Sequence, residues 1–137
     1  MKWIIEKTLE MDAGQERVWN ALTDPRELEQ WFPDRAKFEA RPGSKGHFFW
    51  ENHGGGDLEV VEVDAPRYLA WRWAGGDERP LQEYATLVEF TLTPRADGGT
   101  TLHLKESGFD NQKNYEDNDG GWDSELGELV GYLAKAA

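Results

Sequence analysis

The chain has 137 residues, of which 15 are basic and 27 are acidic, so its net charge is −12. This length predicts one domain over residues 1–137, because two domains would each lack an adequate core. The acidic balance argues against binding to nucleic acid or anionic lipid, since both depend on cationic side chains. No cysteine is present, which excludes disulfides and thiolate metal sites.

The first residues do not have the pattern of a signal peptide, because Met1-Lys2-Trp3-Ile4-Ile5 is followed at once by Glu6. No apolar run approaches the length that a bilayer requires. We therefore expect a cytoplasmic protein without membrane insertion.

The N-terminal segment predicts a strand. Residues 2–11 alternate between apolar and polar side chains, as a half-buried strand does. The apolar face carries Trp3, Ile5, Leu9 and Met11. Lys7 shares this face and is its exception.

Two short helices are expected next. Asp12 with Gln15 predicts a capping box that opens the first helix. Asp24 with Glu27 predicts a second box, in which Pro25 takes the first helical position. The apolar residues of the two helices are Val18, Trp19 and Leu22, then Leu28, Trp31 and Phe32, and Pro33 ends the second.

From residue 36 to residue 107 the pattern predicts only strands and turns. The expected strands are 36–40, 47–52, 58–64, 68–73, 85–93 and 100–107. Residues 53–57 are too rich in glycine for anything but a turn, and 97–99 predict a hairpin. Because short turns join successive strands, we expect an antiparallel meander.

The C-terminal segment predicts a polar linker over residues 107–121 and then a helix. Its apolar stripe recurs at helical spacing and consists of Trp122, Leu126, Leu129 and Leu133, widened by Val130. Glu125 and Glu128 lie outside this stripe. Gly127 and Gly131 weaken the helix, or else permit its close approach to the sheet.

The order of elements predicts an α+β fold. A curved antiparallel sheet of about seven strands would carry two short helices after its first strand. A long C-terminal helix across the concave face would bury both apolar stripes. Such a sheet leaves a volume beneath the helix, which either side chains or a ligand must fill.

Several segments carry a resemblance to a known family. These are residues 16–25 with Trp31-Phe32, residues 61–69, Gly99-Thr100-Thr101-Leu102, Ser107-Gly108-Phe109 and Gly121-Trp122. They resemble the helix-grip (START-like, SRPBCC) superfamily, in the branch first named for the activator of the 90-kDa heat-shock chaperone ATPase. The resemblance implies the fold, whereas members serve as carriers, cyclases, resistance proteins and co-chaperones.

Glu106 is the most informative titratable residue. Relatives often carry histidine before Ser-Gly-Phe, where this chain has Glu106. Alternation places it beside Leu102 and Leu104, on the cavity side if that face is the inner one. Burial would raise its pKa, as a general acid or base requires. Alternatively, it lies at the strand end, paired or hydrated.

No cofactor or metal is expected. His47, His53 and His103 lack metal-ligand spacing. Residues 116–121 fail the register of a calcium loop, and we interpret them as an acidic cap on the last helix. Gly54-Gly55-Gly56 lacks the lysine and helix that a phosphate loop needs, and no Gly-x-Ser-x-Gly elbow is present.

The aromatic residues suggest where a ligand would bind. Seven Trp, six Phe and four Tyr stand in a chain that is only 38% hydrophobic. Large rings fit a cavity wall, although a conventional aromatic core is equally compatible. The expected ligand-binding residues are Phe48, Trp50, Leu69, Trp71, Trp73, Val88, Phe90, Leu104, Glu106, Trp122, Leu126 and Leu129.

The leading functional hypothesis is non-catalytic binding of a small hydrophobic molecule of aromatic, polyketide-like or lipid-like type. The cavity would lie between the sheet and the C-terminal helix. One alternative is a polyketide cyclase or hydrolase in which Glu106 is the acid or base. Another is a protein-interaction module that acts on a chaperone.

Overall fold

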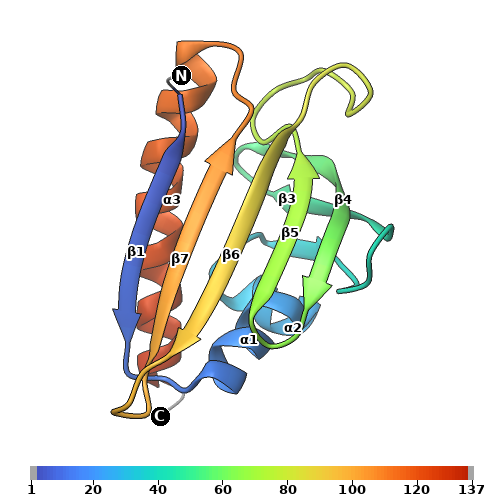
Figure 1. Ribbon diagram of the computed structural model, residues 1–137. Coiled ribbons are helices and arrows are strands. Elements are labelled where there is room, and N and C mark those ends of the chain that lie inside the picture. The colour runs from blue at the N-terminus through green and yellow to red at the C-terminus, as the bar shows by residue number, and fades with distance from the viewer. Residues whose placement is uncertain (1–2, 136–137) are drawn as a thin grey trace.

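A computed structural model of the protein describes residues 3–135 (Figure 1). Seven strands form one antiparallel sheet in the order β1-β7-β6-β5-β4-β3-β2. The elements are β1 (Ile5–Met11), α1 (Gln15–Thr23), α2 (Pro25–Trp31), β2 (Arg35–Lys37), β3 (Lys45–Trp50), β4 (Gly54–Asp64), β5 (Tyr68–Trp73), β6 (Thr86–Pro94), β7 (Thr100–Ser107) and α3 (Gln112–Lys135).

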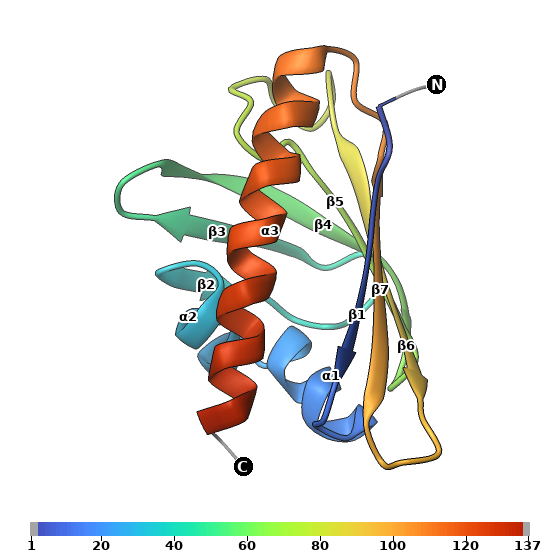
Figure 2. The same cartoon turned by 90° about the vertical axis from the view of Figure 1, so that its left-hand side faces the viewer.

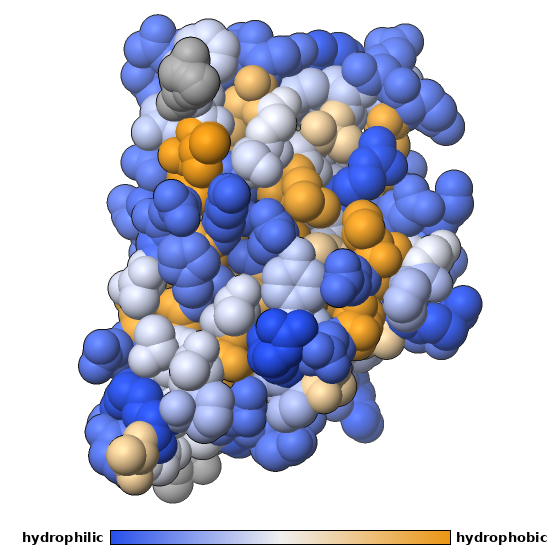
Figure 3. Space-filling view, in the orientation of Figure 1, coloured by the Kyte–Doolittle hydropathy of each residue, from blue (hydrophilic) through white to orange (hydrophobic). Residues whose placement is uncertain are grey.

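The layers match the expected helix-grip arrangement. Figure 2 shows α3 lying along the concave face, while β3 and β4 curve behind it and α1 and α2 close the lower end. The opposite face of the sheet is mostly hydrophilic, with scattered apolar side chains (Figure 3). The predicted α+β fold is therefore confirmed. No helix in residues 3–135 is long and apolar enough to cross a membrane.

Alternation along β6 and β7 sets the inner face of the sheet. In β6 the buried side chains are Thr86, Val88, Phe90 and Leu92, and in β7 they are Thr100, Leu102, Leu104 and Glu106. The two strands pair Val88 with Glu106 and Phe90 with Leu104. Since successive side chains of a strand point to opposite faces, this register directs Glu106 towards α3.

Lys7, the exception on the apolar face of β1, has partners on α3. Its ammonium group lies 2.9 Å from Asp119 and 2.8 Å from Asp123. The cation thus joins the edge strand to the helix, which explains a lysine on an inward-facing position.

The first capping prediction was wrong and the second was right in part. Helix α1 begins with Gly14 as its N-cap and has no side-chain cap, so Asp12 does not cap it. At α2 the Asp24 carboxylate accepts a hydrogen bond from the backbone N–H of Arg26 at 2.9 Å. Glu27 does not complete the box, because its carboxylate bonds to Arg17 and Tyr132 instead.

Several strand boundaries also differ from the prediction, and two of the differences are informative. Strand β2 covers only residues 35–37, and Gly54-Gly55-Gly56 forms the start of β4 rather than a turn. These glycines pair with Phe48, Phe49 and Trp50 of β3. A Cβ on Gly55 would collide with the carbonyl oxygen of Phe48, so the absent side chain permits this close pairing.

The largest correction concerns α3, which begins at Gln112, ten residues before the expected start at Trp122. Residues 112–121 are therefore helical and are not a linker or an acidic cap. The Asn111 side chain accepts from the backbone N–H of Asn114 at 2.8 Å and so satisfies a donor of the first turn. Tertiary contacts from Lys7 and Asp77 hold this glycine-containing half in place.

Gly127 and Gly131 do not bring α3 closer to the sheet. Both are exposed, and a Cβ at either position would meet nothing within 4 Å. They therefore lower helix stability without a packing benefit.

Replacing both glycines by alanine is expected to raise the free energy of unfolding by about 1–2 kcal/mol, from about 0.5–1 kcal/mol for each glycine. Denaturant unfolding measures the change. Gly46→Ala is the opposing control, because its Cβ would collide with the Lys37 carbonyl group. An unchanged midpoint for the double variant would contradict the argument.

Candidate functional site

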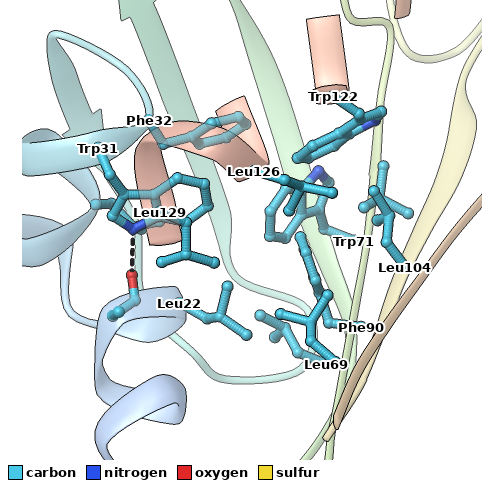
Figure 4. Packing of buried hydrophobic residues seen from close by; sticks show 14 of the residues in the cluster. Leu22, Trp31, Phe32, Leu69, Trp71, Phe90, Leu104, Trp122, Leu126 and Leu129 are labelled. Carbon is cyan, nitrogen blue, oxygen red and sulfur yellow. Dashed lines mark hydrogen bonds between the residues drawn. The ribbon is translucent and has the colours of Figure 1, made fainter. Parts of the chain in front are cut away.

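The space between the sheet and α3 is largely filled by the expected ligand-binding residues themselves. All twelve lie on the concave face or on the facing side of α3, and all except Trp50 are buried. In Figure 4, Trp122, Leu126 and Leu129 of α3 face Leu69, Trp71 and Phe90 of the sheet. The ring centroid of Trp71 is 5.3 Å from that of Phe90 and 5.5 Å from that of Phe48.

Phe32, which follows α2, organises the aromatic side chains at one end of this core. Its ring stacks on Trp122 with centroids 5.4 Å apart and on Trp73 at 5.9 Å. It meets Trp50 edge-on at 5.2 Å. From the sequence, Phe32 was expected only in the apolar stripe of the second helix, and its contacts with two strands, β3 and β5, and with α3 were missed.

An open pocket of about 690 Å³ lies where these rings meet the surface. We call it the aromatic pocket, and its apolar wall consists of Phe32, Trp50, Trp73 and Trp122. Polar or small residues complete the lining, namely Asp34, Asn52, His53, Gly75, Gly76, Asp117, Asn118, Gly121, Ser124 and Glu125. Of the twelve expected residues, Trp50, Trp73 and Trp122 line this pocket, and the other nine do not.

A second depression, of about 470 Å³, lies under the loop between β5 and β6. Charged side chains dominate it, including Lys37, Lys45 and Arg72 beside Glu59. It lacks a wall of Phe, Trp or Tyr, so it does not match the apolar character expected of a hydrophobic ligand site.

Glu106 lies beneath the aromatic pocket with its side chain fully buried. Its carboxylate accepts from Trp122 Nε1 at 2.7 Å, from Trp73 Nε1 at 2.8 Å and from Thr86 Oγ1 at 2.5 Å. Burial raises the pKa of Glu106, and the three hydrogen bonds oppose the rise only in part. Of the two placements that the sequence left open for Glu106, the structure has the inward one, and the direction of the pKa shift is the one expected from burial.

The bonding of Glu106 assigns it a positioning role. It joins the indole of Trp73 on β5 to the indole of Trp122 on α3, and both rings line the pocket. Glu106 does not line the pocket, and both of its oxygens have partners. The carboxylate thus fixes two walls of the pocket from behind.

Glu125 is an ionisable residue of the pocket that was not expected at a ligand site, because the sequence placed it outside the apolar stripe of the helix. Trp50 Nε1 donates to its carboxylate at 3.0 Å and to the Phe32 carbonyl at 2.9 Å. Burial, followed by the negative charges of Glu128 and Asp34, raises the pKa of Glu125 to about 7, although the Trp50 hydrogen bond opposes this. Its position three residues after Trp122, on the same side of a helix, was the available signal.

The loop between β5 and β6 forms one rim of the pocket and is held by charges. The Arg79 guanidinium bonds to Asp77 at 2.9 Å and to Asp110 at 2.8 Å, and it lies 4.1 Å from the centre of the Tyr84 ring. Gly75 from this loop lies against the Trp73 indole, where a Cβ would approach the ring within 3.0 Å. The rim is therefore anchored to the segment that enters α3.

Trp71 carries the one buried side-chain nitrogen or oxygen in residues 3–135 that has no hydrogen-bond partner, its Nε1. A buried N–H without an acceptor costs free energy, so this nitrogen is a local cost within the core.

The three histidines occupy separate surroundings. His47 contacts Asp57 at 2.9 Å, His103 contacts Glu6 at 3.2 Å, and His53 lines the aromatic pocket. Within the part of the chain that the structure describes, no group of three or more His, Cys, Asp or Glu side chains could hold a metal ion.

Comparison with known proteins places this geometry in a family. Residues 12–134 match the family described as "Activator of Hsp90 ATPase homolog 1-like protein". The chain belongs to this family. The resemblance noted in the sequence is thereby confirmed. No curated protein matches the chain.

Solved structures share the family's fold. Protein MLL2253 from Mesorhizobium loti is 26% identical with a TM-score of 0.87, over 98% of each chain. DynU16, a protein of the dynemicin biosynthetic locus, is 25% identical with a TM-score of 0.85, over 99% of this chain and 49% of its own. The Aha1 dimer from Colwellia psychrerythraea is 21% identical with a TM-score of 0.80, over 93% of this chain and 92% of its own. At this identity the similarity supports a common fold only.

Glu106→Gln is expected to lower the free energy of unfolding by about 1–3 kcal/mol, because an amide leaves one buried indole N–H without an acceptor. The loss should depend on pH. Since folding raises the pKa of Glu106 above 4.5, the folded state binds the proton more tightly, and this stabilisation is lost as the pH rises through the folded pKa. The advantage of the native chain should therefore shrink with rising pH.

Denaturant unfolding at several pH values measures this difference. Glu116→Gln, at an exposed position of α3, is the control and should show no such trend. An advantage of Glu106 that stays constant or grows with pH would refute a raised pKa in the folded protein.

Proposed function

We propose that the protein binds small apolar molecules with a flat aromatic body in the aromatic pocket and does not transform them. The observation that carries this proposal is the open pocket lined by Phe32, Trp50, Trp73 and Trp122, among which Trp50 is the partly exposed ring. Such rings offer large apolar area and favourable stacking to a flat ligand. The pocket volume lies within the range usual for small-molecule sites.

Pre-organisation of the wall supports binding. Trp73 and Trp122 are fixed by Glu106, and Trp50 is fixed by the Phe32 carbonyl and Glu125. A ligand that enters a wall held in this way orders few side chains, which keeps the entropic cost of binding low. The similarity to DynU16, a protein of a biosynthetic locus, is compatible with a small-molecule ligand.

The bonding of Glu106 favours binding over turnover. An acid or base must lie within hydrogen-bond reach of the group that it protonates or deprotonates. Glu106 contacts the indoles that face the pocket but is not itself part of the lining. The carboxylate that alternation suggested for cyclase chemistry therefore supports the wall.

A two-dimensional NMR titration with flavonoids, fatty acids, sterols and polyketides tests the proposal. We expect saturable shifts of the indole N–H signals of Trp50, Trp73 and Trp122 with flat aromatic ligands. Trp50→Leu should weaken binding about tenfold, because it removes one stacking surface worth about 1 kcal/mol or more. Trp3→Leu, which changes an indole outside the pocket, should leave the affinity unchanged.

Two results would count against the site. Shifts confined to other parts of the chain would show that the ligand binds at a different site. Equal affinities of Trp50→Leu and the native protein would show that Trp50 does not contact the ligand. The absence of any saturable shift with all four ligand classes would show that the protein does not bind small molecules of these classes.

A further inference from the structure

The aromatic pocket carries an excess of negative charge. Its lining contains three carboxylates, Asp34, Asp117 and Glu125, whereas His53 is the one basic side chain. Asp117 is paired with Lys113 at 2.7 Å. Among the described residues, no cationic group lies within salt-bridge distance of Asp34 or Glu125.

The two unpaired carboxylates have only neutral donors. Asp34 accepts from the backbone N–H of Glu51 at 2.6 Å, and Glu125 accepts from Trp50 Nε1 at 3.0 Å. Asp34 is exposed, whereas Glu125 is half-buried, and burying a carboxylate without a counter-ion costs free energy. The negative charges of Glu128 and Asp34 add repulsion. The raised pKa of Glu125 reflects both effects. A positive charge placed here would relieve both.

The aromatic wall favours the same kind of charge. The faces of Trp, Tyr and Phe rings attract ammonium and guanidinium groups, and Trp does so most strongly. Trp50 presents its indole beside the Glu125 carboxylate, to which it is bonded. Ring face and carboxylate are thus combined in one pocket, as sites for organic cations require.

We propose that the aromatic pocket selects organic cations, in which an ammonium or amidinium group is joined to a flat apolar body. The apolar body lies against the aromatic wall, and the cation lies at Glu125 and Asp34. This inference rests on the proposed function and adds the charge of the ligand. Neutral ligands of the same shape bind more weakly, and anionic ones are repelled.

Three probes of one shape separate charge from shape, namely naphthylmethylammonium, naphthylmethanol and naphthoate. Calorimetry and NMR titration at about pH 8, above the pKa of about 7 of Glu125, give their affinities. We expect the ammonium probe to bind about tenfold or more tightly than the alcohol, as a charge-assisted contact supplies. Naphthoate should bind more weakly than the alcohol.

Glu125→Gln should reduce the ratio of the affinities for the ammonium probe and for naphthylmethanol to less than about threefold. Glu116→Gln removes the same charge from an exposed position of α3 outside the pocket and is the matched control. Its preference for the ammonium probe should stay close to that of the native protein.

The affinity for the cation should also depend on pH in a defined direction. As the pH rises through about 7, Glu125 loses its proton, so binding of the ammonium probe tightens. Binding near pH 7 should release a proton, which calorimetry in two buffers detects. His53 lines the same pocket, and the trend should persist in His53→Gln.

The outcomes distinguish this inference from the proposed function. If the alcohol binds as tightly as the ammonium probe, or if cation binding weakens as the pH rises, the cation preference is wrong while binding in the pocket stands. If all three probes fail to bind, the aromatic pocket does not take flat apolar ligands, and both proposals fall.

Discussion

One buried carboxylate connects the sheet to the helix that crosses it. Glu106 on β7 receives hydrogen bonds from indoles on β5 and α3 and from the Thr86 hydroxyl on β6. A buried carboxylate is tolerated only where such donors are in place, so the three elements are held in one relative position. The wall of the aromatic pocket depends on this position, because Trp73 and Trp122 belong to both arrangements.

The aromatic residues both fill the core and line the aromatic pocket, and the same ring contacts connect the two regions. A chain that is only 38% hydrophobic must obtain its core from few side chains, and rings supply much area each. Trp71, Phe48 and Phe90 are used for this purpose at the centre of the sheet. Towards the aromatic pocket the same packing continues through Phe32 to Trp50, whose partial exposure leaves the edge of the core open.

The alternation of apolar and polar residues was sufficient to predict which side chains of β5, β6 and β7 face inward. The local pattern did not predict features that depend on contacts between residues far apart in the sequence. Helix α3 begins at Gln112 because Lys7 and Asp77 bond to its first half, and neither contact is visible in residues 112–121. The pocket lies at the end of the core rather than beneath the middle of the helix, because the side chains expected to enclose a cavity pack against one another. Glu125 belongs to the pocket because it accepts a hydrogen bond from Trp50, which is 75 residues away in the sequence.

The glycines of α3 have a consequence for how the pocket wall behaves. Gly120, Gly121, Gly127 and Gly131 together cost the helix up to about 4 kcal/mol relative to alanine. A segment of this composition does not persist as a helix in isolation and takes its form from the surface on which it lies. Helix α3 therefore depends on tertiary contacts for its helical form. Glu106 and Lys7 of the sheet bond to α3 and stabilise the part of the helix that lines the pocket.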